Sequence, residues 1–309
     1  MVGRRDFLAS ASAVALAGCV AGTRAPMRAA SGRPRFHVFS KMFQPPVTAS
    51  PEALCDLLAA AGCDGVQWTV RKGGHATPEN AARELPRLVE IARSRGLGCE
   101  SICTAIVDGD DSAAETVCRA AAGCGITQLR TGYLFYDDKR ESFHGSMDRF
   151  KRTFASLARL GERTGMKLAY QNHSTWGPPI FGGVVWDVHE CIRDLDPRWI
   201  GLEYDPMHAC FETGGSWKHS FALMAPWISA VDLKDFRYRM DPKRPGQAAK
   251  EMVAAGKGVV PWADVRRLVE THGVDPLYIV HFEYDFDKSN LPRTVRAERD
   301  AFARVLGGG

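Results

Sequence analysis

Ile200-Gly201-Leu202-Glu203-Tyr204-Asp205-Pro206-Met207-His208 is the stretch of sequence that decides the fold. Its first part is a short β-rich run, and a proline and ligand-type side chains follow at once. Similar runs recur along the chain with helical patterns between them. Strict alternation of eight strands with helices predicts an α/β fold of the (β/α)8 TIM barrel class, whose active sites lie at the carboxyl ends of the strands. The eight predicted strands are Phe36–Ser40, Gly65–Thr69, Gly98–Thr104, Ile126–Thr131, Lys167–Gln171, Ile200–Asp205, Ile228–Lys234 and Leu277–Glu283.

The segments between these runs carry apolar residues at spacings of three and four, with Pro or Ser near their starts. Glycine follows several of them, where a left-handed helix end is expected. A doubly wound open sheet is the rival fold, but no strand leads into a G-x-G-x-x-G turn, so a dinucleotide site is not indicated. The clearest predicted helices are Pro51–Ala61, Pro78–Arg95, Phe143–Thr164 and Leu291–Leu306, and the predicted end glycines are Gly62, Gly96, Gly125 and Gly165.

Composition excludes several classes of protein. The chain has 309 residues, of which 45% are hydrophobic and 25% charged, so it is long enough to form a sizeable core. The 40 Lys and Arg against 36 Asp and Glu give a net charge of only +4 without a basic block, so no nucleic-acid partner is indicated. After the N-terminus, no apolar run reaches the roughly 18 residues of a transmembrane helix.

The N-terminus is predicted to be an export signal. Arg4-Arg5-Asp6-Phe7-Leu8 precedes an uncharged Ala-rich stretch, as in a twin-arginine signal peptide, which assigns residues 1–18 to the signal. Leu16-Ala17-Gly18-Cys19 resembles a bacterial lipobox, so Cys19 is expected to carry a lipid anchor, the only predicted membrane contact. The alternative is cleavage nearby, with Cys19 removed or inert. Residues 19–34 are predicted to be a tether and 35–309 a single domain in an exported, periplasmic or membrane-anchored protein.

The nine cysteines give two opposite indications. Export favours disulfides, whereas the twin-arginine route carries proteins that have already folded in the reducing cytoplasm. The chain contains no C-x-x-C pair, so no cysteine metal site is predicted. The cysteines in apolar helical contexts are instead interpreted as small buried hydrophobic residues, namely Cys55, Cys63, Cys118 and Cys191.

Four consecutive strands end in ligand-type residues. These ends are 170–173, 203–208, 232–235 and 281–285. Because side chains alternate along a strand, inward-facing residues of the four ends should converge above the barrel. Oxygen ligands with one imidazole suit Mn²⁺, Mg²⁺ or Co²⁺, with Zn²⁺ possible. The predicted metal ligands are Gln171, Asp205, Asp232 and His281.

Other residues at these ends are candidates for chemistry or binding. His208 follows Asp205 at a spacing of three and is predicted to bind substrate, the alternative being a pair that caps the next helix. Asn172 and His173 begin a segment that cannot be helical and are expected to line the mouth, Asn172 binding substrate and His173 acting in catalysis. Lys234 ends an apolar strand, where an ammonium needs a substrate oxyanion or a salt bridge to Asp205 or Glu283.

Three further predictions concern neighbouring residues. Glu203 is interpreted as a core carboxylate paired with Arg130. Asp232 has the alternative of pointing out of the barrel as a helix cap. Aromatic residues after four strands are candidates for a sugar platform, with ordinary packing as the alternative for each: Trp68, Tyr133, Trp176 and Trp217.

Several of these motifs resemble the xylose isomerase-like TIM-barrel superfamily. They are Asp205-x-x-His208, the Lys234-Asp235 pair, and Gly256-x-Gly258-Val259-Val260-Pro261-Trp262. The segments 170–174 and 281–284 are most similar to the branch of exported proteins labelled sugar phosphate isomerase/epimerase. The resemblance covers essentially the whole mature chain and implies a (β/α)8 barrel that acts on sugars, often as a dimer or tetramer, so a homo-oligomer is possible.

The resemblance also implies roles for individual residues. Members of the superfamily place metal-binding Glu, Asp, His and Glu at the ends of strands five to eight, which correspond here to Gln171, Asp205, Asp232 and His281, with Glu283 as an alternative ligand. Only Asp205 keeps its type. The two positions of the family's acid/base pair correspond to Gln171 and His281, and Gln cannot accept a proton. His281 and Glu283 are therefore the candidates for moving a proton.

The leading functional hypothesis is a divalent-metal-dependent sugar isomerase or epimerase-like enzyme, with a keto-sugar lyase as a variant. His281, Glu283 or His173 would remove the proton alpha to a carbonyl, with Lys234 as a further catalytic residue. The alternative is a catalytically degenerate, surface-tethered sugar-binding protein. A DNA repair endonuclease of the same superfamily is disfavoured by the export signal and the weak net charge.

Overall fold

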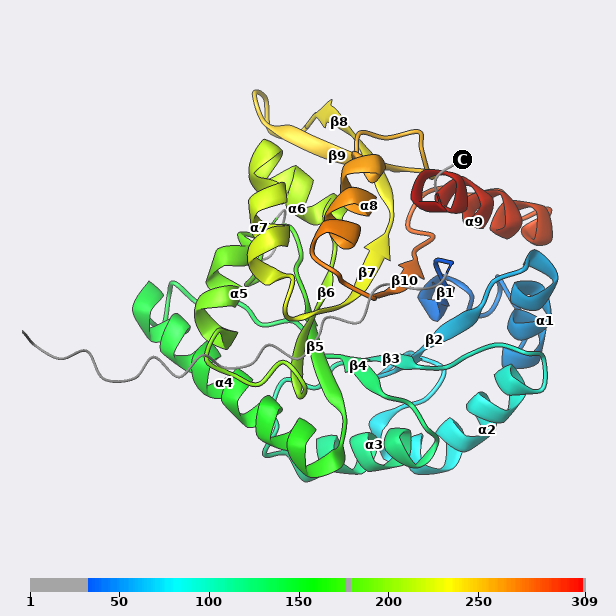
Figure 1. The fold of residues 1–309 in the computed structure, drawn as a ribbon, viewed down its shortest axis with the longest axis horizontal. Coiled ribbons are helices and arrows are strands. Elements are labelled where there is room, and N and C mark those ends of the chain that lie inside the picture. The colour runs from blue at the N-terminus through cyan, green and yellow to red at the C-terminus, as the bar shows by residue number, and fades with distance from the viewer. Residues whose placement is uncertain (1–32, 176–178, 308–309) are drawn as a thin grey trace, which may run out of the picture.

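The computed structural model describes residues 33–175 and 179–307 of the chain. Eight parallel strands form a closed barrel with helices around it (Figure 1), which confirms the predicted (β/α)8 class. The order around the barrel is β1-β10-β7-β6-β5-β4-β3-β2. The strands are β1 (Phe36–Phe39), β2 (Gly65–Val70), β3 (Ser101–Thr104), β4 (Gln128–Arg130), β5 (Lys167–Gln171), β6 (Ile200–Tyr204), β7 (Ile228–Leu233) and β10 (Leu277–Val280).

The strands that sequence periodicity predicts are all present, but most are shorter. The predicted strand eight extended to residue 283, whereas β10 ends at Val280. Three of the predicted strands extended past the ladder to Asp205, Lys234 and Glu283, whose side chains bond to one another. The carboxyl end of the barrel therefore includes polar residues just beyond the strands as well as residues within them.

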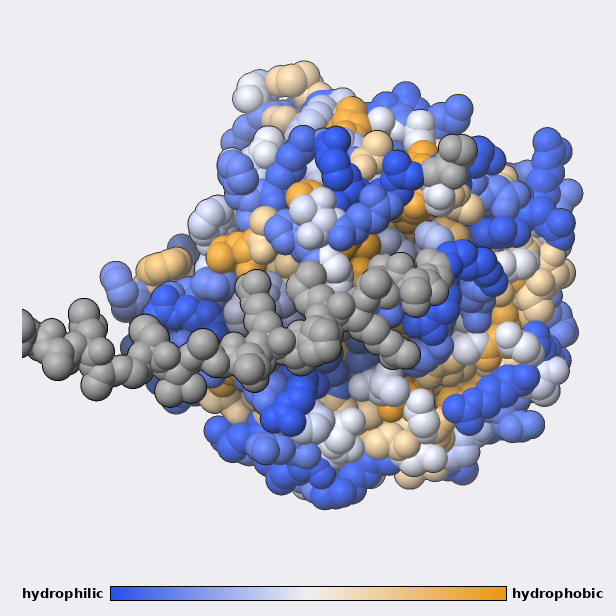
Figure 2. Space-filling model, viewed as in Figure 1, coloured by the Kyte–Doolittle hydropathy of each residue, from blue (hydrophilic) through white to orange (hydrophobic). Residues whose placement is uncertain are grey.

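Helices cover the outside of the barrel, and the last helix packs beside the first. They are α1 (Pro51–Ala61), α2 (Ala81–Arg93), α3 (Ser112–Gly123), α4 (Phe143–Thr164), α5 (Val185–Ile192), α6 (Pro206–Thr213), α7 (Trp217–Met224), α8 (Trp262–Thr271) and α9 (Leu291–Gly307), with short 3-10 turns η1 (Ser40–Met42), η2 (Pro78–Asn80) and η3 (Gly214–Ser216). Figure 2 shows that hydrophilic side chains dominate the outer surface on this face. No helix in the described part of the chain combines the length and the apolar character needed to span a bilayer.

The ends of α1 show how the sequence fixes a helix locally. The Ser50 hydroxyl accepts a hydrogen bond from the Ala53 amide at 3.2 Å, and Pro51 occupies the first helical position. Gly62 ends the helix at φ 77°, a left-handed conformation that favours glycine. The other predicted end glycines, at 96, 125 and 165, also have positive φ.

Two shells of buried side chains hold the barrel together. The outer shell lies between strands and helices and contains most of the large apolar residues, including the four cysteines predicted to be buried. The apolar cluster inside the barrel is small: Phe39, Cys103, Ala230, Leu277 and Ile279. Much of the remaining barrel interior is polar, which is unusual for a core and marks the part of the barrel where buried groups must find partners.

A β-hairpin that the sequence analysis did not predict follows β7. Strands β8 (Asp235–Met240) and β9 (Ala248–Val253) form a separate two-stranded antiparallel sheet. Asp235 anchors its base, because its carboxylate accepts hydrogen bonds from the backbone amides of Gly256 and Gly258, both at 3.1 Å. A Cβ at position 258 would lie 2.0 Å from Asp235 Oδ1, so only glycine fits there. This contact joins two motifs that are 21 residues apart in the sequence.

Most of the residues for which N-terminal features were predicted lie outside the described range. These are the signal peptide at 1–18, Cys19, and the tether up to residue 32. At the edge of the described chain, the Arg33 guanidinium forms a salt bridge with Asp64 at 2.5 Å. Asp64 also accepts a hydrogen bond from the Phe36 amide at 2.8 Å, so the chain is fixed to the barrel where β1 begins.

Candidate functional site

The four predicted metal ligands converge at the carboxyl ends of β5, β6, β7 and β10. All four side chains are buried. The Gln171 amide nitrogen donates to Asp205 Oδ2 at 3.2 Å and also contacts Asp232. His281 Nε2 lies 3.1 Å from Asp232 Oδ1. Asp232 therefore points into the barrel, not outward as a helix cap, and the inward alternation predicted from the sequence holds at all four strand ends.

Lys234 lies among these carboxylates. Its ammonium is 2.9 Å from Asp205 Oδ2 and 3.2 Å from Glu283 Oε2. The side chain is only 3% exposed, and burial alone would lower the pKa of Lys234, but Asp205 and Glu283 raise it far above its usual value. The predicted salt bridges to Asp205 and Glu283 are thus both present, and Lys234 is a permanent cation at the centre of the site.

Glu283 is the most accessible member of the group, with a side chain that is 24% exposed. Lys41, from the short turn η1 after β1, lies 3.4 Å from its carboxylate, and His281 Nδ1 lies 3.7 Å away. Burial would raise the pKa of Glu283, but Lys234, His281 and Lys41 hold it well below its usual range. Glu283 is therefore ionised at neutral pH. Lys41 was not among the residues predicted from the sequence, although its position directly after strand one placed it at the same end of the barrel.

His173 and His208 form a second group beside the first. Their ring centroids are 3.8 Å apart, and the ring of Tyr133 lies 5.1 Å from that of His173. Burial, helped by the positive charge of Lys234, lowers the pKa of His173 to about 3, and the pKa of His208 is lowered as well. Both imidazoles are therefore neutral at neutral pH.

Asp205 also caps α6, because its Oδ1 accepts the His208 backbone amide at 3.1 Å. The capping alternative considered for this pair is therefore real, and it exists together with the position of Asp205 in the site. His208 Nε2 lies 3.5 Å from Asp205 Oδ2, and its Nδ1 lies 2.9 Å from the Ser174 hydroxyl. One loop-to-helix junction thus orients both side chains.

Lys250, on strand β9 of the hairpin, reaches the same place and was missed in the sequence. Its ammonium contacts the Ser174 hydroxyl and lies 3.4 Å from His208 Nδ1. Burial, with the nearby charge of Lys234, lowers the pKa of Lys250 to about 8. No local motif marks Lys250, because only the tertiary position of the hairpin brings it to the barrel.

Several predicted substrate-binding residues have other roles. The Asn172 side chain is fully buried and bonds to the backbone of Asp205 on both sides: its Nδ2 donates to the Asp205 carbonyl at 3.0 Å, and its Oδ1 accepts from the Asp205 amide at 2.7 Å. Asn172 therefore positions Asp205, and its side chain is not exposed to a substrate.

Of the aromatic residues predicted to form a sugar platform, one lies at the site and two are buried elsewhere. The prediction of a sugar platform is wrong for Trp68, which is fully buried in the outer shell because it faces away from the barrel interior, and Trp217 is also buried. Tyr133 does lie at the site, where its hydroxyl donates to the Gln171 side-chain oxygen. Trp176 lies outside the described residues.

Below this layer, Glu203 forms a deeper buried group with Asp232 and His281. The predicted pair with Arg130 is present at 3.4 Å, and Gln67 donates to Glu203 at 2.9 Å. Burial, together with the charge of Asp232, raises the pKa of Glu203 to about 8. Burial would lower the pKa of His281, but Asp232 raises it. A proton is therefore held within this group near neutral pH.

This deeper group could hold a metal ion. One ligand atom from each of Glu203, Asp232 and His281 lies within 4.8 Å of the others. Asp232 Oδ1 and His281 Nε2 face one another at 3.1 Å, and neither atom forms a hydrogen bond of regular geometry with any other described residue. Two carboxylates with an imidazole suit a divalent ion. Asp205 and Gln171 are less available than predicted, because Lys234 and Tyr133 occupy their inward-facing oxygens.

Comparison with known proteins gives a family and several similar folds. Residues 55–304 match the family described as xylose isomerase-like TIM barrel. No curated protein matches the chain. Among solved structures, D-psicose 3-epimerase with D-tagatose from Clostridium cellulolyticum H10 is 11% identical, with 88% of this chain and 99% of that chain covered and a TM-score of 0.67.

Two further solved structures have similar folds. The 3-keto-D-glucoside 4-epimerase from E. coli is 12% identical, with coverage of 89% and 100% and a TM-score of 0.64. A xylose isomerase-like TIM barrel protein from Mycobacterium smegmatis in complex with magnesium is 14% identical, with coverage of 91% and 100% and a TM-score of 0.62. At these identities the likeness shows the fold alone. The structural neighbours include sugar epimerases and a metal-bound protein.

Proposed function

Because the chain belongs to the xylose isomerase-like TIM barrel family, we propose that it is a sugar-modifying enzyme that removes the proton alpha to a carbonyl of a sugar or sugar derivative. One observation carries the proposal: a fixed cation, an ionised carboxylate and an imidazole lie together at the carboxyl end of the barrel, in Lys234, Glu283 and His281. Enolisation of a carbonyl compound requires a base for the alpha proton and a positive charge near the carbonyl oxygen, and an imidazole can carry the proton afterwards. Isomerisation, epimerisation and elimination share this first step.

Lys234 supplies the positive charge. Removal of an alpha proton places negative charge on the carbonyl oxygen, and a buried ammonium close to that oxygen stabilises it more strongly than water does. The two salt bridges of Lys234 hold the ammonium in place before substrate arrives, so little reorganisation is needed.

Glu283 is the base in this proposal. It is ionised and partly exposed, so it is both ready to accept a proton and reachable from the mouth of the barrel. A substrate oxygen that binds Lys234 weakens the Lys234–Glu283 contact and makes the carboxylate more basic. His281, whose pKa is raised, lies 3.7 Å from Glu283 and is the group able to hold and return a proton. His173, the other candidate, has a pKa lowered to about 3, so it stays neutral and is not the proton acceptor in this proposal.

A divalent ion is part of the proposal, and Glu203, Asp232 and His281 are the residues that would hold it. When bound, such an ion would polarise substrate oxygens as a Lewis acid. Mn²⁺, Mg²⁺ and Co²⁺ remain the predicted ions, with Zn²⁺ as the further possibility. The magnesium complex of the Mycobacterium smegmatis neighbour supports a metal in this fold.

The test is exchange of the alpha hydrogen with solvent deuterium, followed by proton NMR in D₂O. D-psicose, D-tagatose and a 3-keto-glucoside are the first substrates, as the names of the neighbours suggest. We expect exchange in the wild-type protein and a rate lower by about 100-fold or more in Glu283→Gln. Glu251→Gln, an exposed glutamate on the hairpin, is the matched control and should exchange at the wild-type rate.

The same experiment separates the alternatives. Saturable sugar binding without exchange in the wild-type protein would mean that the chain is the sugar-binding protein considered above. Metal content by mass spectrometry and exchange after chelation test the ion: a chelated protein that keeps its full rate refutes the metal and leaves the enolisation proposal standing on Lys234 and Glu283.

We further propose that the enzyme works outside the cytoplasm, supported by the Arg4-Arg5 signal and the Leu16-Ala17-Gly18-Cys19 lipobox. Cell fractionation tests the location, with replacement of both arginines by lysine expected to retain the protein in the cytoplasm. A Cys19→Ala variant should leave the membrane fraction, and unchanged membrane association in that variant refutes the lipid anchor.

A further inference from the structure

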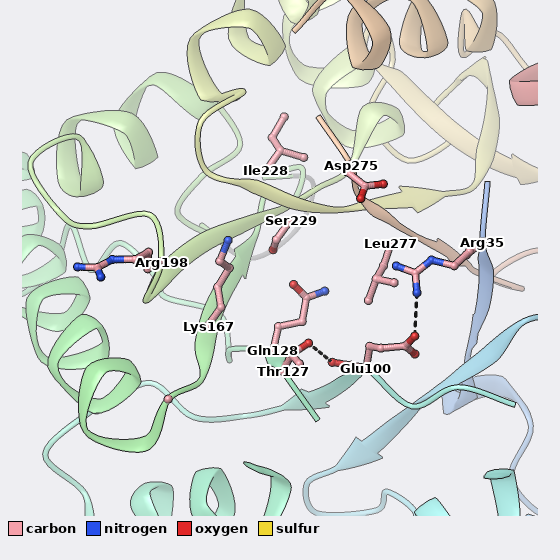
Figure 3. A pocket seen from close by; sticks show the side chains of 11 residues that line it. Arg35, Glu100, Thr127, Gln128, Lys167, Arg198, Ile228, Ser229, Asp275 and Leu277 are labelled. Atoms are coloured by element: carbon pink, nitrogen blue, oxygen red, sulfur yellow. Dashed lines mark hydrogen bonds and ion pairs between the residues drawn. The ribbon is translucent and has the colours of Figure 1, made fainter. Parts of the chain in front are cut away.

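A cavity lies at the opposite end of the barrel from the candidate site. Its volume is about 380 Å³, within the range of small-molecule sites. Figure 3 shows the side chains that line it. It lies where strands begin: Gln128 is the first residue of β4, and Lys167 is the first residue of β5. Side chains from three strands line it, namely Gln128, Lys167 and Ser229, together with side chains just before three other strands, namely Arg35, Glu100 and Asp275.

Two features of the backbone make room for this cavity. The register between β6 and β7 shifts after Leu202, so that Ser229 has no partner on β6. Such bulges re-aim a side chain. The neighbouring residue Gly201 has no side chain, and a Cβ there would lie 3.0 Å from Lys167 Cδ and 3.2 Å from Ser229 Oγ. The space beside Lys167 and Ser229 therefore depends on glycine at position 201.

Hydrogen-bond donors line this space without partners. Gln128 Nε2 and Ser229 Oγ are buried and make no hydrogen bond. Within the described residues, the Lys167 ammonium forms no salt bridge or hydrogen bond. Burial lowers the pKa of Lys167, and Asp196 opposes this only in part. Buried polar groups are normally paired, so an unpaired set of this kind needs an explanation.

We propose that this cavity binds a small hydroxylated anion through its carboxylate or phosphate oxygens. Lys167, Gln128 and Ser229 supply N–H and O–H donors to the anionic oxygens. Arg35, held at 2.9 Å by Glu100, adds a second positive charge at the edge. The carboxylates of Glu100 and Asp275 can accept hydrogen bonds from hydroxyl groups and disfavour a ligand with many charges.

The site is separate from the proposed chemistry. Catalysis in this fold takes place at the carboxyl ends of the strands, whereas this cavity lies at their amino ends. A ligand there would act on stability or regulation and would not be the reacting sugar. The inference therefore does not depend on the proposed function.

Titration calorimetry with two probes tests the proposal: inorganic phosphate and D-gluconate, in a buffer that contains neither. We expect saturable binding of at least one probe, and the probe that binds identifies the group recognised. Lys167→Met keeps the length of the side chain and removes its charge, and it should weaken binding at least 10-fold. Gly201→Ala keeps every charge and fills the space, and it should weaken binding similarly.

Two controls define the location. Lys139→Met removes an exposed lysine, and Glu283→Gln changes the opposite end of the barrel, so both should bind like the wild-type protein. Circular dichroism confirms that each variant is folded. Absence of saturable binding for both probes overturns the proposal. So does wild-type affinity in folded Lys167→Met and Gly201→Ala, or loss of binding in Glu283→Gln.

Discussion

Replacing Lys234 by methionine tests the electrostatic description of the site most directly. The variant keeps a side chain of similar length and removes the ammonium that lies 2.9 Å from Asp205 and 3.2 Å from Glu283. Asp205 is fully buried, so the change leaves its charge without its counter-ion. Burial already acts to raise the pKa of Asp205, and Lys234 is the main group that opposes it.

The expected cost follows from this burial. Removing one partner of a buried ion pair destabilises a protein by about 3–5 kcal/mol, because the remaining charge is uncompensated. Glu283 contributes little to this cost, since it is partly exposed and keeps its contact with Lys41 at 3.4 Å. We therefore expect the free energy of unfolding to fall by about 4 kcal/mol in Lys234→Met at pH 7.

Urea denaturation followed by circular dichroism measures this change. The double variant Lys234→Met/Asp205→Asn should recover much of the loss, because the neutral amide needs no counter-ion and Asn can still cap α6. Lys218→Met is the matched control: it removes a salt bridge to Asp264 from a lysine that is 44% exposed, and it should cost less than about 1 kcal/mol. A loss below about 1 kcal/mol in Lys234→Met, or no recovery in the double variant, would refute the reasoning.

Two further predictions concern stability away from the site. Burial raises the pKa of Glu298 from 4.5 to about 7 even though Tyr284 donates to its carboxylate, so this side chain favours the folded state below pH 4.5 and loses that contribution as the pH rises through 7. Glu298→Gln should therefore reduce the fall in the free energy of unfolding between pH 5 and 8, measured by urea denaturation, by up to about 3 kcal/mol. The same fall in both proteins would contradict this. A Cβ at Gly109 would lie 2.1 Å from the Ser156 carbonyl oxygen, so Gly109→Ala should lower the melting temperature and the free energy of unfolding, the latter by about 3 kcal/mol. Gly123→Ala is the control, because a Cβ there meets no atom within 4 Å at the end of α3, and it should be neutral or slightly stabilising. Equal effects of the two changes would show that the close contact is not what requires glycine at position 109.

The site could be predicted in part because strand periodicity is local. Two residues that are two apart on a strand share a face, so the sequence could place Gln171, Asp205, Asp232 and His281 on the inner faces of their strands. The structure confirms that they meet. Their partners were harder to predict, because a hydrogen bond such as that from Tyr133 to Gln171 joins residues that are 38 positions apart.

The wrong and missing predictions have a common cause. Trp68 was placed at the mouth because it lies near a strand end, but it has the opposite parity to Gln67 and Thr69 and packs under the helices. Asn172 has ligand chemistry but serves the backbone of Asp205. Lys250 reaches the site only because the β8–β9 hairpin folds back over it, and no local pattern encodes that direction.

By itself the sequence determined the fold class and the end of the barrel where polar groups collect. Both follow from short-range physics: alternation along a strand, spacing along a helix, and caps such as Ser50 and Gly62 act within a few residues. Only the tertiary structure decided which charges compensate one another, that Lys234 lies between Asp205 and Glu283, and that an unpaired Lys167 faces a cavity at the other end. Those outcomes depend on burial and on distances between strands that are far apart in the chain, and electrostatic energies in a protein interior are set by those two quantities.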